Sequence, residues 1–226
     1  MTTCPASCAD DDLVRRVSAN LETVRARIAS TGRAIESVRV VAVTKAFGPE
    51  MVRAAKASGV DCVGENYLDE LIAKRAATAD VDVRWHFLGA LQTNKISRVL
   101  AAADVVCTVS RAKEIDKIAA HTPGAHVYVQ VDCTGAPGRN GAAAHDVASL
   151  VTHGRGQGLD VRGLMTVAPA RVHDAREAFH ITSELADELA LVERSMGMSD
   201  DLEVACEYGT TEVRVGRALF GPRTAP

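Results

Sequence analysis

The chain has 226 residues, a formal net charge of -3 at pH 7, 47% hydrophobic residues and 24% charged residues. A chain of this length and composition can bury a full hydrophobic core in one domain without help from a metal or from disulfides. Its weakly acidic charge, with lysines and arginines scattered along the sequence, argues against a nucleic-acid partner. No apolar window approaches the length of a membrane span, and we expect a cytoplasmic protein.

The N-terminal segment and the cysteines give no sign of secretion. Residues 1–12 lack the basic region and the apolar core of a signal peptide, and we expect them to form a disordered tail. The six cysteines contain no Cys-x-x-Cys pair, and no histidine pair accompanies them at zinc spacing. Four of them fall in apolar patterns, where cysteine is usually a small core residue. We therefore interpret them as core residues in a reducing compartment and predict no metal site.

Beyond the tail, patterns typical of strands and of helices alternate along the chain. An amphipathic helix is expected first, and short β-branched strands that lead into helical patterns follow it. The strands are expected at residues 38–44, 62–64, 83–88, 105–109, 126–131, 161–167, 193–198 and 212–215. The helices are expected at residues 13–30, 50–58, 68–77, 94–103, 112–121, 143–156, 172–194 and 201–208.

This alternation requires parallel strands joined by right-handed crossovers, as in an open doubly wound sheet or a closed eight-stranded barrel. The count of eight strands favours the barrel. A dinucleotide-binding sheet would place Gly-x-Gly-x-x-Gly after the first strand, whereas this strand continues as Thr-Lys-Ala-Phe-Gly over residues 44–48. We therefore predict an α/β fold, a TIM (β/α)8 barrel over residues 13–226, with an extra helix at its N-terminus.

Lys45 stands where the first apolar strand pattern ends. In a (β/α)8 barrel, functional groups lie at the carboxyl ends of the strands. Desolvation there would lower the pKa of a lysine and make its amine available for Schiff-base chemistry. Taken alone, the position is also explained by a solvated strand end, which is the commoner case. Lys45 is thus a candidate anchor for an aldehyde, and further sequence features are needed to support this interpretation.

The segments around the last two strands suit a phosphate, which barrels of this kind commonly bind there. Residues 196–201 place a glycine and Ser199 before a helix N-terminus, although Ser199 is equally well explained as an N-cap. Residues 209–217 add two hydroxyls, a guanidinium and a glycine, although a turn and a charged strand also explain them. A reactive lysine facing a phosphate cradle in one barrel mouth is what pyridoxal phosphate requires.

Five sequence blocks make the chain resemble the pyridoxal phosphate homeostasis proteins. This family has a fold similar to the barrel domain of alanine racemase and of ornithine decarboxylase. The resemblance runs from about Leu13 to Arg223. Its blocks are VAVTK ending at Lys45, GENY at residues 64–67, WHFLGALQTNK at 85–95, GLMTVAP at 163–169 and the long block at 195–221.

The resemblance implies a site for the vitamin B6 cofactor pyridoxal 5′-phosphate, held by a Schiff base to Lys45. Asn66 matches a polar residue that lines the cofactor site, and Arg214 matches the arginine that meets the pyridine nitrogen. Ser199, Thr210, Gly216 and Arg217 lie where the family's phosphate-contacting loops lie, and Met198 is a further predicted cofactor residue. A further signature to which we assign no role contains His86, Gln92, Asn94 and Lys95.

Arg214 bears on what such a site could catalyse. A guanidinium stays protonated, so it donates to the ring nitrogen and disfavours the pyridinium form that makes the cofactor a strong electron sink. Alanine racemase also takes a second base from a tyrosine of another domain, which we do not expect here. We therefore expect a carrier that buffers the cofactor or delivers it to pyridoxal phosphate-dependent apoenzymes, acts as a monomer and has no clear turnover.

Two alternatives stay open. One is a fold-type-III racemase or decarboxylase of amino acids that uses the same cofactor. The other is a cofactor-free barrel enzyme that uses Lys45 as a Schiff-base lysine on a phosphorylated metabolite.

The chain also departs from its relatives in the loop at residues 133–141. Where they commonly carry an acidic residue and a lysine before a glycine, it has Ala136 and Arg139, so the role of this loop is open.

Overall fold

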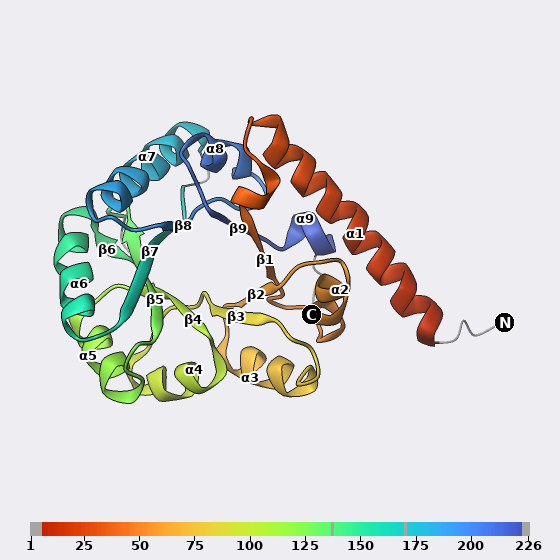
Figure 1. The fold of residues 1–226 in the computed structure, drawn as a ribbon, viewed down its shortest axis with the longest axis horizontal. Helices are drawn as coiled ribbons and strands as arrows, with labels where there is room; N and C mark the ends of the chain where they lie inside the picture. Colours follow the sequence, from red (N-terminus) through yellow and green to blue (C-terminus); the bar gives the residue numbers. More distant parts are fainter. Residues whose placement is uncertain (1–5, 137, 170, 223–226) are drawn as a thin grey trace.

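The computed structural model describes residues 6–136, 138–169 and 171–222, and these form a closed barrel of parallel strands ringed by helices (Figure 1). Neighbouring strands pair all the way round, because β1 pairs with both β2 and β9 while β4 pairs with β5. This confirms the predicted (β/α)8 barrel. Its strands are β1 (Arg39–Val43), β2 (Cys62–Glu65), β3 (Arg84–Phe87), β4 (Val105–Val109), β5 (His126–Asp132), β7 (Asp160–Thr166), β8 (Glu193–Ser195) and β9 (Glu212–Val215).

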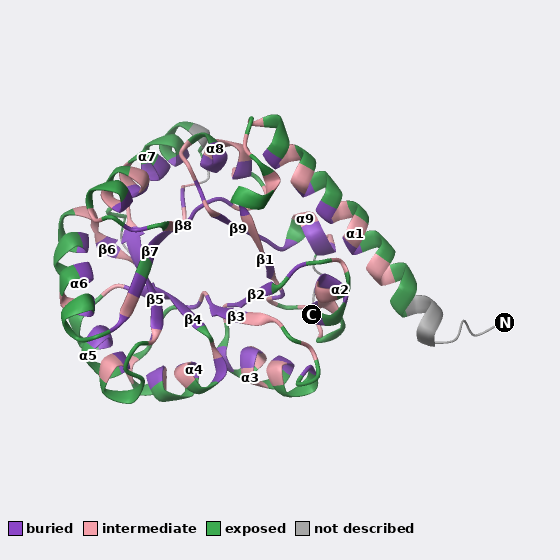
Figure 2. Ribbon diagram, in the orientation of Figure 1, coloured by how far each residue is buried: buried purple, intermediate pink, exposed green. Residues whose placement is uncertain are grey.

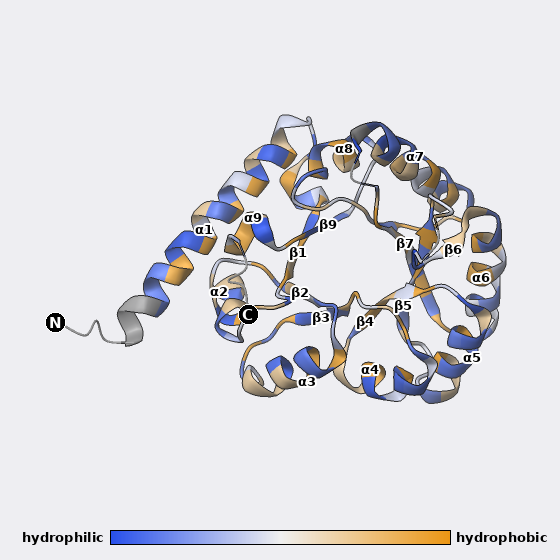
Figure 3. Cartoon of the chain, turned by 180° about the vertical axis from the view of Figure 1, so that it is seen from behind, coloured by the Kyte–Doolittle hydropathy of each residue, from blue (hydrophilic) through white to orange (hydrophobic). Residues whose placement is uncertain are grey.

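Helices between the strands cover the outside of the barrel, as expected from their amphipathic patterns. Figure 2 shows exposed residues on their outer faces and buried residues along the strands. Figure 3, seen from behind, shows hydrophobic and hydrophilic segments alternating along these helices. The helices are α1 (Ala6–Ser30), α2 (Glu50–Ala57), α3 (Leu68–Ala77), α4 (Ile96–Ala102), α5 (Ala112–His121), α6 (Ala144–Gly156), α7 (Val172–Glu188), α8 (Leu202–Glu207) and α9 (Arg217–Phe220). No helix in the described part of the chain has the length and apolarity needed to cross a membrane.

Helix α1 lies across the outside of the barrel beside α2 and α9 (Figure 1). It begins at Ala6, so seven residues that we assigned to the tail are helical. Residues 1–5 lie outside the described residues, and their expected disorder stays a prediction. One stripe of the helix is buried at spacings of three and four residues, through Val17, Leu21, Val24 and Ile28. This stripe attaches the helix to the barrel.

The largest error in the predicted elements concerns the end of α7, which we placed at residue 194. The helix ends at Glu188, because Ala190 adopts a left-handed conformation with φ of 50°. Leu191 N donates to Ala186 O at 2.8 Å and Ala190 N to Asp187 O at 3.1 Å, which is the pattern of a Schellman motif. An alanine gives no sequence signal for this turn, which glycine usually occupies. The residues released from the helix lead into β8.

Smaller differences concern short elements. The expected strand at residues 193–198 ends at Ser195, and the expected helix at 94–103 divides into the 3-10 turn η2 (Thr93–Lys95) and α4. The elements that we did not predict are η1 (Ile35–Ser37), β6 (Ala142–Ala143) and α9. The interpretation of the cysteines as core residues is confirmed for three of them, because Cys62, Cys107 and Cys206 are buried. Cys4 and the side chain of Cys8 lie outside the described residues.

The barrel interior combines an apolar cluster with charged side chains. The cluster consists of Val105, Cys107, Tyr128 and Met165, and Leu88 and Val167 pack against it. Toward the amino ends, Glu193 contacts His126 Nε2 at 3.1 Å and Arg39 Nη2 at 3.6 Å. Burial alone would raise the pKa of Glu193, but its hydrogen bond to His126 and the charges of His126 and Arg39 outweigh burial and lower the pKa to about 2.

We expect the barrel to lose stability in acid through Glu193. A depressed pKa contributes stability that is present above the unfolded value near 4.5 and is lost as pH falls through about 2, which amounts to roughly 3 kcal/mol. Glu193→Gln should therefore lower the free energy of unfolding at pH 7, and the difference from the wild type should shrink toward pH 2. Urea unfolding across this pH range measures it, with the exposed Glu177→Gln as control. A difference that does not depend on pH would contradict the assignment.

Gly163 sets the spacing between two barrel strands. It is opposite Glu193 in the register of β7 and β8, and a Cβ at this position would lie 2.4 Å from Glu193 O. Gly163→Ala should therefore lower the free energy of unfolding by about 1–3 kcal/mol. Gly156→Ala is the matched control, because nothing lies within 4 Å of a Cβ at the end of α6 and an alanine favours the helix. Equal stabilities of the two variants in denaturant unfolding would show that the strands can separate without cost.

Candidate functional site

A cavity of about 550 Å³ opens at the carboxyl ends of the barrel strands. Of the eight predicted cofactor residues, seven line it, and the structure brings them together from four segments of the chain. They are Lys45, Asn66, Met198, Ser199, Arg214, Gly216 and Arg217. The lining residues that we did not predict are Val43, Leu88, Met165, Val167, Asp200, Gly221 and Pro222. Most of these are apolar residues at strand ends. Their side chains carry no reactive or charged group that would mark them as site residues in the sequence.

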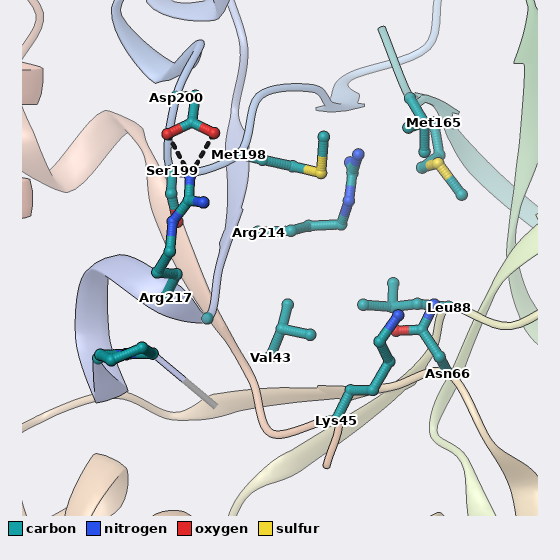
Figure 4. Close-up of a pocket in the computed structure, with 14 residues that line it drawn as sticks. Val43, Lys45, Asn66, Leu88, Met165, Met198, Ser199, Asp200, Arg214 and Arg217 are labelled. Carbon is teal, nitrogen blue, oxygen red and sulfur yellow. Dashed lines mark hydrogen bonds and ion pairs between the residues drawn. The ribbon is translucent and has the colours of Figure 1, made fainter. Parts of the chain in front are cut away.

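Lys45 follows β1 and is half-buried. Its side chain points into the cavity beside that of Asn66, while Arg214 enters from another side and Arg217 stands at the opposite side (Figure 4). The amine Nζ lies 5.7 Å from the ring centroid of Tyr67, whose side chain is exposed. The amine is thus inside the cavity and still close to solvent.

A buried ionic network holds the turn that carries Lys45. Lys74, which is 6% exposed, donates to Thr44 O at 2.7 Å, to Glu70 Oε2 at 2.8 Å and to the carboxylate of Glu65. Thr44 Oγ1 also donates to Glu65 Oε1 at 2.6 Å, and Ala46 N donates to Glu70 Oε2 at 3.0 Å. Ala46 has φ of 62°, a strained conformation for alanine. The network therefore fixes the residues on both sides of Lys45.

Sequence reasoning missed this network. Glu70 and Lys74 form an i, i+4 pair on α3, a pattern that usually marks an exposed helix face. Nothing in the spacing indicates that Lys74 is buried against Glu65. Burial raises the pKa of Glu65, although its hydrogen bonds with Lys74 and Thr44 oppose that shift. The burial of Glu65 and its hydrogen bonds both arise from packing in the closed barrel, so the sequence alone does not reveal them.

Arg214 is a buried cation at the base of the cavity, with 4% of its surface exposed. Its Nη1 donates to Ser195 O at 2.6 Å and to Ser195 Oγ at 2.8 Å, and its Nη2 donates to Thr166 O at 2.7 Å. Burial lowers the pKa of Arg214, and the negative charge of Glu212 opposes that shift. These bonds hold the guanidinium rigidly beside the cavity.

The opposite side of the cavity is polar and more exposed. Arg217 forms an ion pair with both carboxylate oxygens of Asp200 (Figure 4), and both side chains are largely exposed. Ser199 Oγ accepts a hydrogen bond from Ala218 N at 3.2 Å. Ser199 is therefore not the N-cap of α8, the alternative left open by the sequence, because Asp201 holds that position. A hydroxyl and a guanidinium stand together here, as an anion requires.

Gly216 and Thr210 have structural functions in this region. A Cβ on Gly216 would lie 2.9 Å from Val43 O, so the glycine lets the end of β9 approach β1. Thr210 is fully buried and does not line the cavity. Its hydroxyl lies 2.8 Å from Met196 O and accepts from Met196 N at 3.3 Å. The structure thus places Thr210 in the connection between β8 and β9, outside the cavity lining.

The remaining sequence signals lie around the cavity rather than in it. His86 is buried inside the barrel, with Nδ1 3.7 Å from Glu212 Oε1, and does not line the cavity. Gln92, Asn94 and Lys95 lie in and just before η2, outside the cavity lining. In the divergent loop, Arg139 Nη1 donates to Val167 O at 3.3 Å, so this side chain reaches a residue of the cavity wall.

Known proteins match the chain over nearly its full length. Residues 15–224 match the family described as alanine racemase, N-terminal domain. The pyridoxal phosphate homeostasis protein of Pseudomonas aeruginosa is 36% identical over 220 residues, covering 92% of this chain and 96% of that protein. PipY of Synechococcus elongatus, solved without pyridoxal phosphate, superposes with a TM-score of 0.80 at 29% identity, covering 91% of this chain and 100% of PipY. PipY solved with pyridoxal phosphate bound gives a TM-score of 0.78 at 28% identity, with the same coverage. The chain therefore belongs to the family of pyridoxal phosphate homeostasis proteins.

Proposed function

We propose that the protein binds pyridoxal 5′-phosphate through a Schiff base to Lys45 and acts in pyridoxal phosphate homeostasis, buffering the cofactor and delivering it to apoenzymes that need it. The observation that carries this proposal is one cavity onto which an amine, a buried guanidinium and an anion-suited pair of side chains all open, at Lys45, Arg214 and Ser199 with Arg217. The similarity to PipY, which has been solved with pyridoxal phosphate bound, supports it.

The cavity fits this cofactor in size and in chemistry. A volume of about 550 Å³ is within the range of small-molecule sites. Lys45 would meet the aldehyde, Arg214 the ring nitrogen, and Ser199 and Arg217 the phosphate. Val43, Leu88 and Met165 supply apolar surface for an aromatic ring. The residues that we propose to bind the cofactor are Lys45, Asn66, Met198, Ser199, Arg214, Gly216 and Arg217.

The side chains of the site favour reversible binding over turnover. The unprotonated amine of Lys45 would attack the aldehyde carbon, so that a C=N bond replaces the C=O bond and water leaves. When bound, the cofactor supplies this aldehyde and an electron-withdrawing ring. Arg214 donates hydrogen bonds and cannot accept a proton, so it would leave the ring nitrogen unprotonated and the ring a weaker electron sink. Water can then reverse the linkage.

The proposal extends to the setting in which the protein works. We propose that it is a cytoplasmic monomer in which residues 13–226 act as one cofactor-binding domain, and that its partners are pyridoxal phosphate-dependent apoenzymes. The binding chemistry at Lys45 does not depend on this part of the proposal.

Lys45→Ala should abolish the covalent complex. Pyridoxal phosphate added to the wild type should give a Schiff-base absorption band, and borohydride reduction should fix the cofactor on the protein, as mass spectrometry of peptides measures. Lys113→Ala, in an exposed part of α5, is the matched control and should behave as the wild type does. A wild type without a band at saturating cofactor, or a band that persists in Lys45→Ala, would contradict the proposal. Enzymatic racemisation or decarboxylation of amino acids, lost in Lys45→Ala, would show an enzyme instead.

Arg217 and Asp200 should affect phosphate binding in opposite directions. Arg217→Gln removes a charged donor and should weaken pyridoxal phosphate binding about ten-fold, while binding of pyridoxal, which lacks the phosphate, should change little. Asp200→Asn removes the carboxylate that pairs with Arg217 and should strengthen pyridoxal phosphate binding. Absorbance titrations with both ligands measure these effects. Equal losses for the two ligands in Arg217→Gln would place the phosphate elsewhere.

A further inference from the structure

A hydrogen-bonded relay continues from the cavity into the barrel below Arg214. Ser195 Oγ accepts from Arg214 Nη1 at 2.8 Å and donates to Glu212 Oε1 at 2.7 Å. Ser195 and Glu212 have no exposed surface. A single serine hydroxyl therefore joins a buried cation at the base of the cavity to a buried carboxylate in the barrel interior.

Glu212 is itself held from several sides. Its Oε2 accepts from Arg39 Nη1 at 3.3 Å and from the Tyr128 hydroxyl at 3.5 Å. His86 Nδ1 lies 3.7 Å from its Oε1. These neighbours fix the carboxylate in place, so its bond to Ser195 defines where the serine hydroxyl points. The position of that hydroxyl in turn defines one of the three acceptors of Arg214.

The arrangement leaves part of the guanidinium available to a ligand. A guanidinium has five N–H groups, and three of those of Arg214 are used by Ser195 O, Ser195 Oγ and Thr166 O. Within residues 6–136, 138–169 and 171–222, no acceptor is bonded to Nε or takes the second hydrogen of Nη2. The acceptors in the barrel wall thus orient the guanidinium, and unused donors remain at the edge of the cavity.

We propose that Ser195 and Glu212 are positioning residues that determine cofactor affinity through Arg214, an inference that rests on the proposed function. Neither residue lines the cavity, so neither would touch the cofactor. Without the Ser195 hydroxyl, Nη1 loses an acceptor and no group separates the guanidinium from Glu212. The attraction between the two charges then draws Arg214 toward the barrel interior and away from the ring nitrogen.

The test is a double-mutant cycle on pyridoxal phosphate affinity. Ser195→Ala and Glu212→Gln should each weaken binding about ten-fold in absorbance titrations. In an Arg214→Gln background, Ser195→Ala should have almost no further effect, because its action requires the guanidinium. The matched control is Thr182→Ala, which also removes a fully buried hydroxyl, one that donates to Ala178 O within α7 and is outside the relay. Thermal unfolding of each variant establishes that it is folded.

A spectroscopic readout separates positioning from packing. The pH midpoint of the Schiff-base absorption should shift in Ser195→Ala in the same direction as in Arg214→Gln, since both weaken the effect of the cation at the ring. Thr182→Ala should leave the midpoint unchanged.

The outcomes distinguish this inference from the proposed function. A wild type that does not bind pyridoxal phosphate overturns both. Binding by the wild type together with equal behaviour of Ser195→Ala and Thr182→Ala overturns the relay alone. A loss in Ser195→Ala that is fully retained in the Arg214→Gln background assigns Ser195 a packing role and also overturns the relay.

Discussion

The buried guanidinium of Arg214 is the constraint on which the barrel interior depends. Removing a charge from water is costly unless hydrogen bonds and an opposite charge compensate it. Ser195 and Thr166 supply the hydrogen bonds, and Glu212 supplies the charge through the serine. Glu212 then needs compensation of its own, which Arg39 and Tyr128 provide.

This chain of compensation reaches the amino ends of the strands. Arg39 also pairs with Glu193, and Glu193 bonds to His126, which in turn contacts Arg84. Most (β/α)8 barrels fill this space with branched apolar side chains. Here a cation placed at the mouth is matched by a polar interior that extends to the opposite end.

The two sides of the cavity differ in rigidity. Arg214 and the turn at Lys45 are fixed by buried networks, whereas Arg217 and Asp200 form an exposed pair. Exposed pairs contribute little to stability and rearrange readily, while buried networks resist change. In the proposed carrier, the ring and the aldehyde would therefore meet fixed groups, and the phosphate would meet groups that can exchange partners.

Sequence patterns predicted the barrel well because the hydrophobic periodicity of each strand and helix can be recognised within its own short segment. The strands β4 and β9 and the helices α3 and α5 have the expected bounds. The five blocks that resemble the family also contain the seven predicted residues that line the cavity. Patterns failed where the outcome depends on closure of the barrel. Lys74 and Glu212 carry charges that a pattern assigns to the surface, yet both are buried. The Thr210 hydroxyl contacts backbone atoms and is outside the cavity lining. The predicted end of α7 was wrong for a local reason: the left-handed residue that follows the helix is Ala190, and alanine rarely adopts this conformation.

Reversibility of the proposed linkage follows from where Lys45 lies. A Schiff base forms with loss of water and is reversed by water, so its lifetime depends on how freely water reaches the carbon that carries it. Lys45 is half-buried, and Tyr67, the aromatic ring near its amine, is 56% exposed. An enzyme that stabilises a carbanion gains from excluding water at this point. A protein that holds and then releases an aldehyde needs the opposite, and the position of Lys45 beside an exposed ring meets that need. Rigid recognition of the cofactor by Arg214 and access of water to the amine of Lys45 would therefore be compatible demands on one cavity.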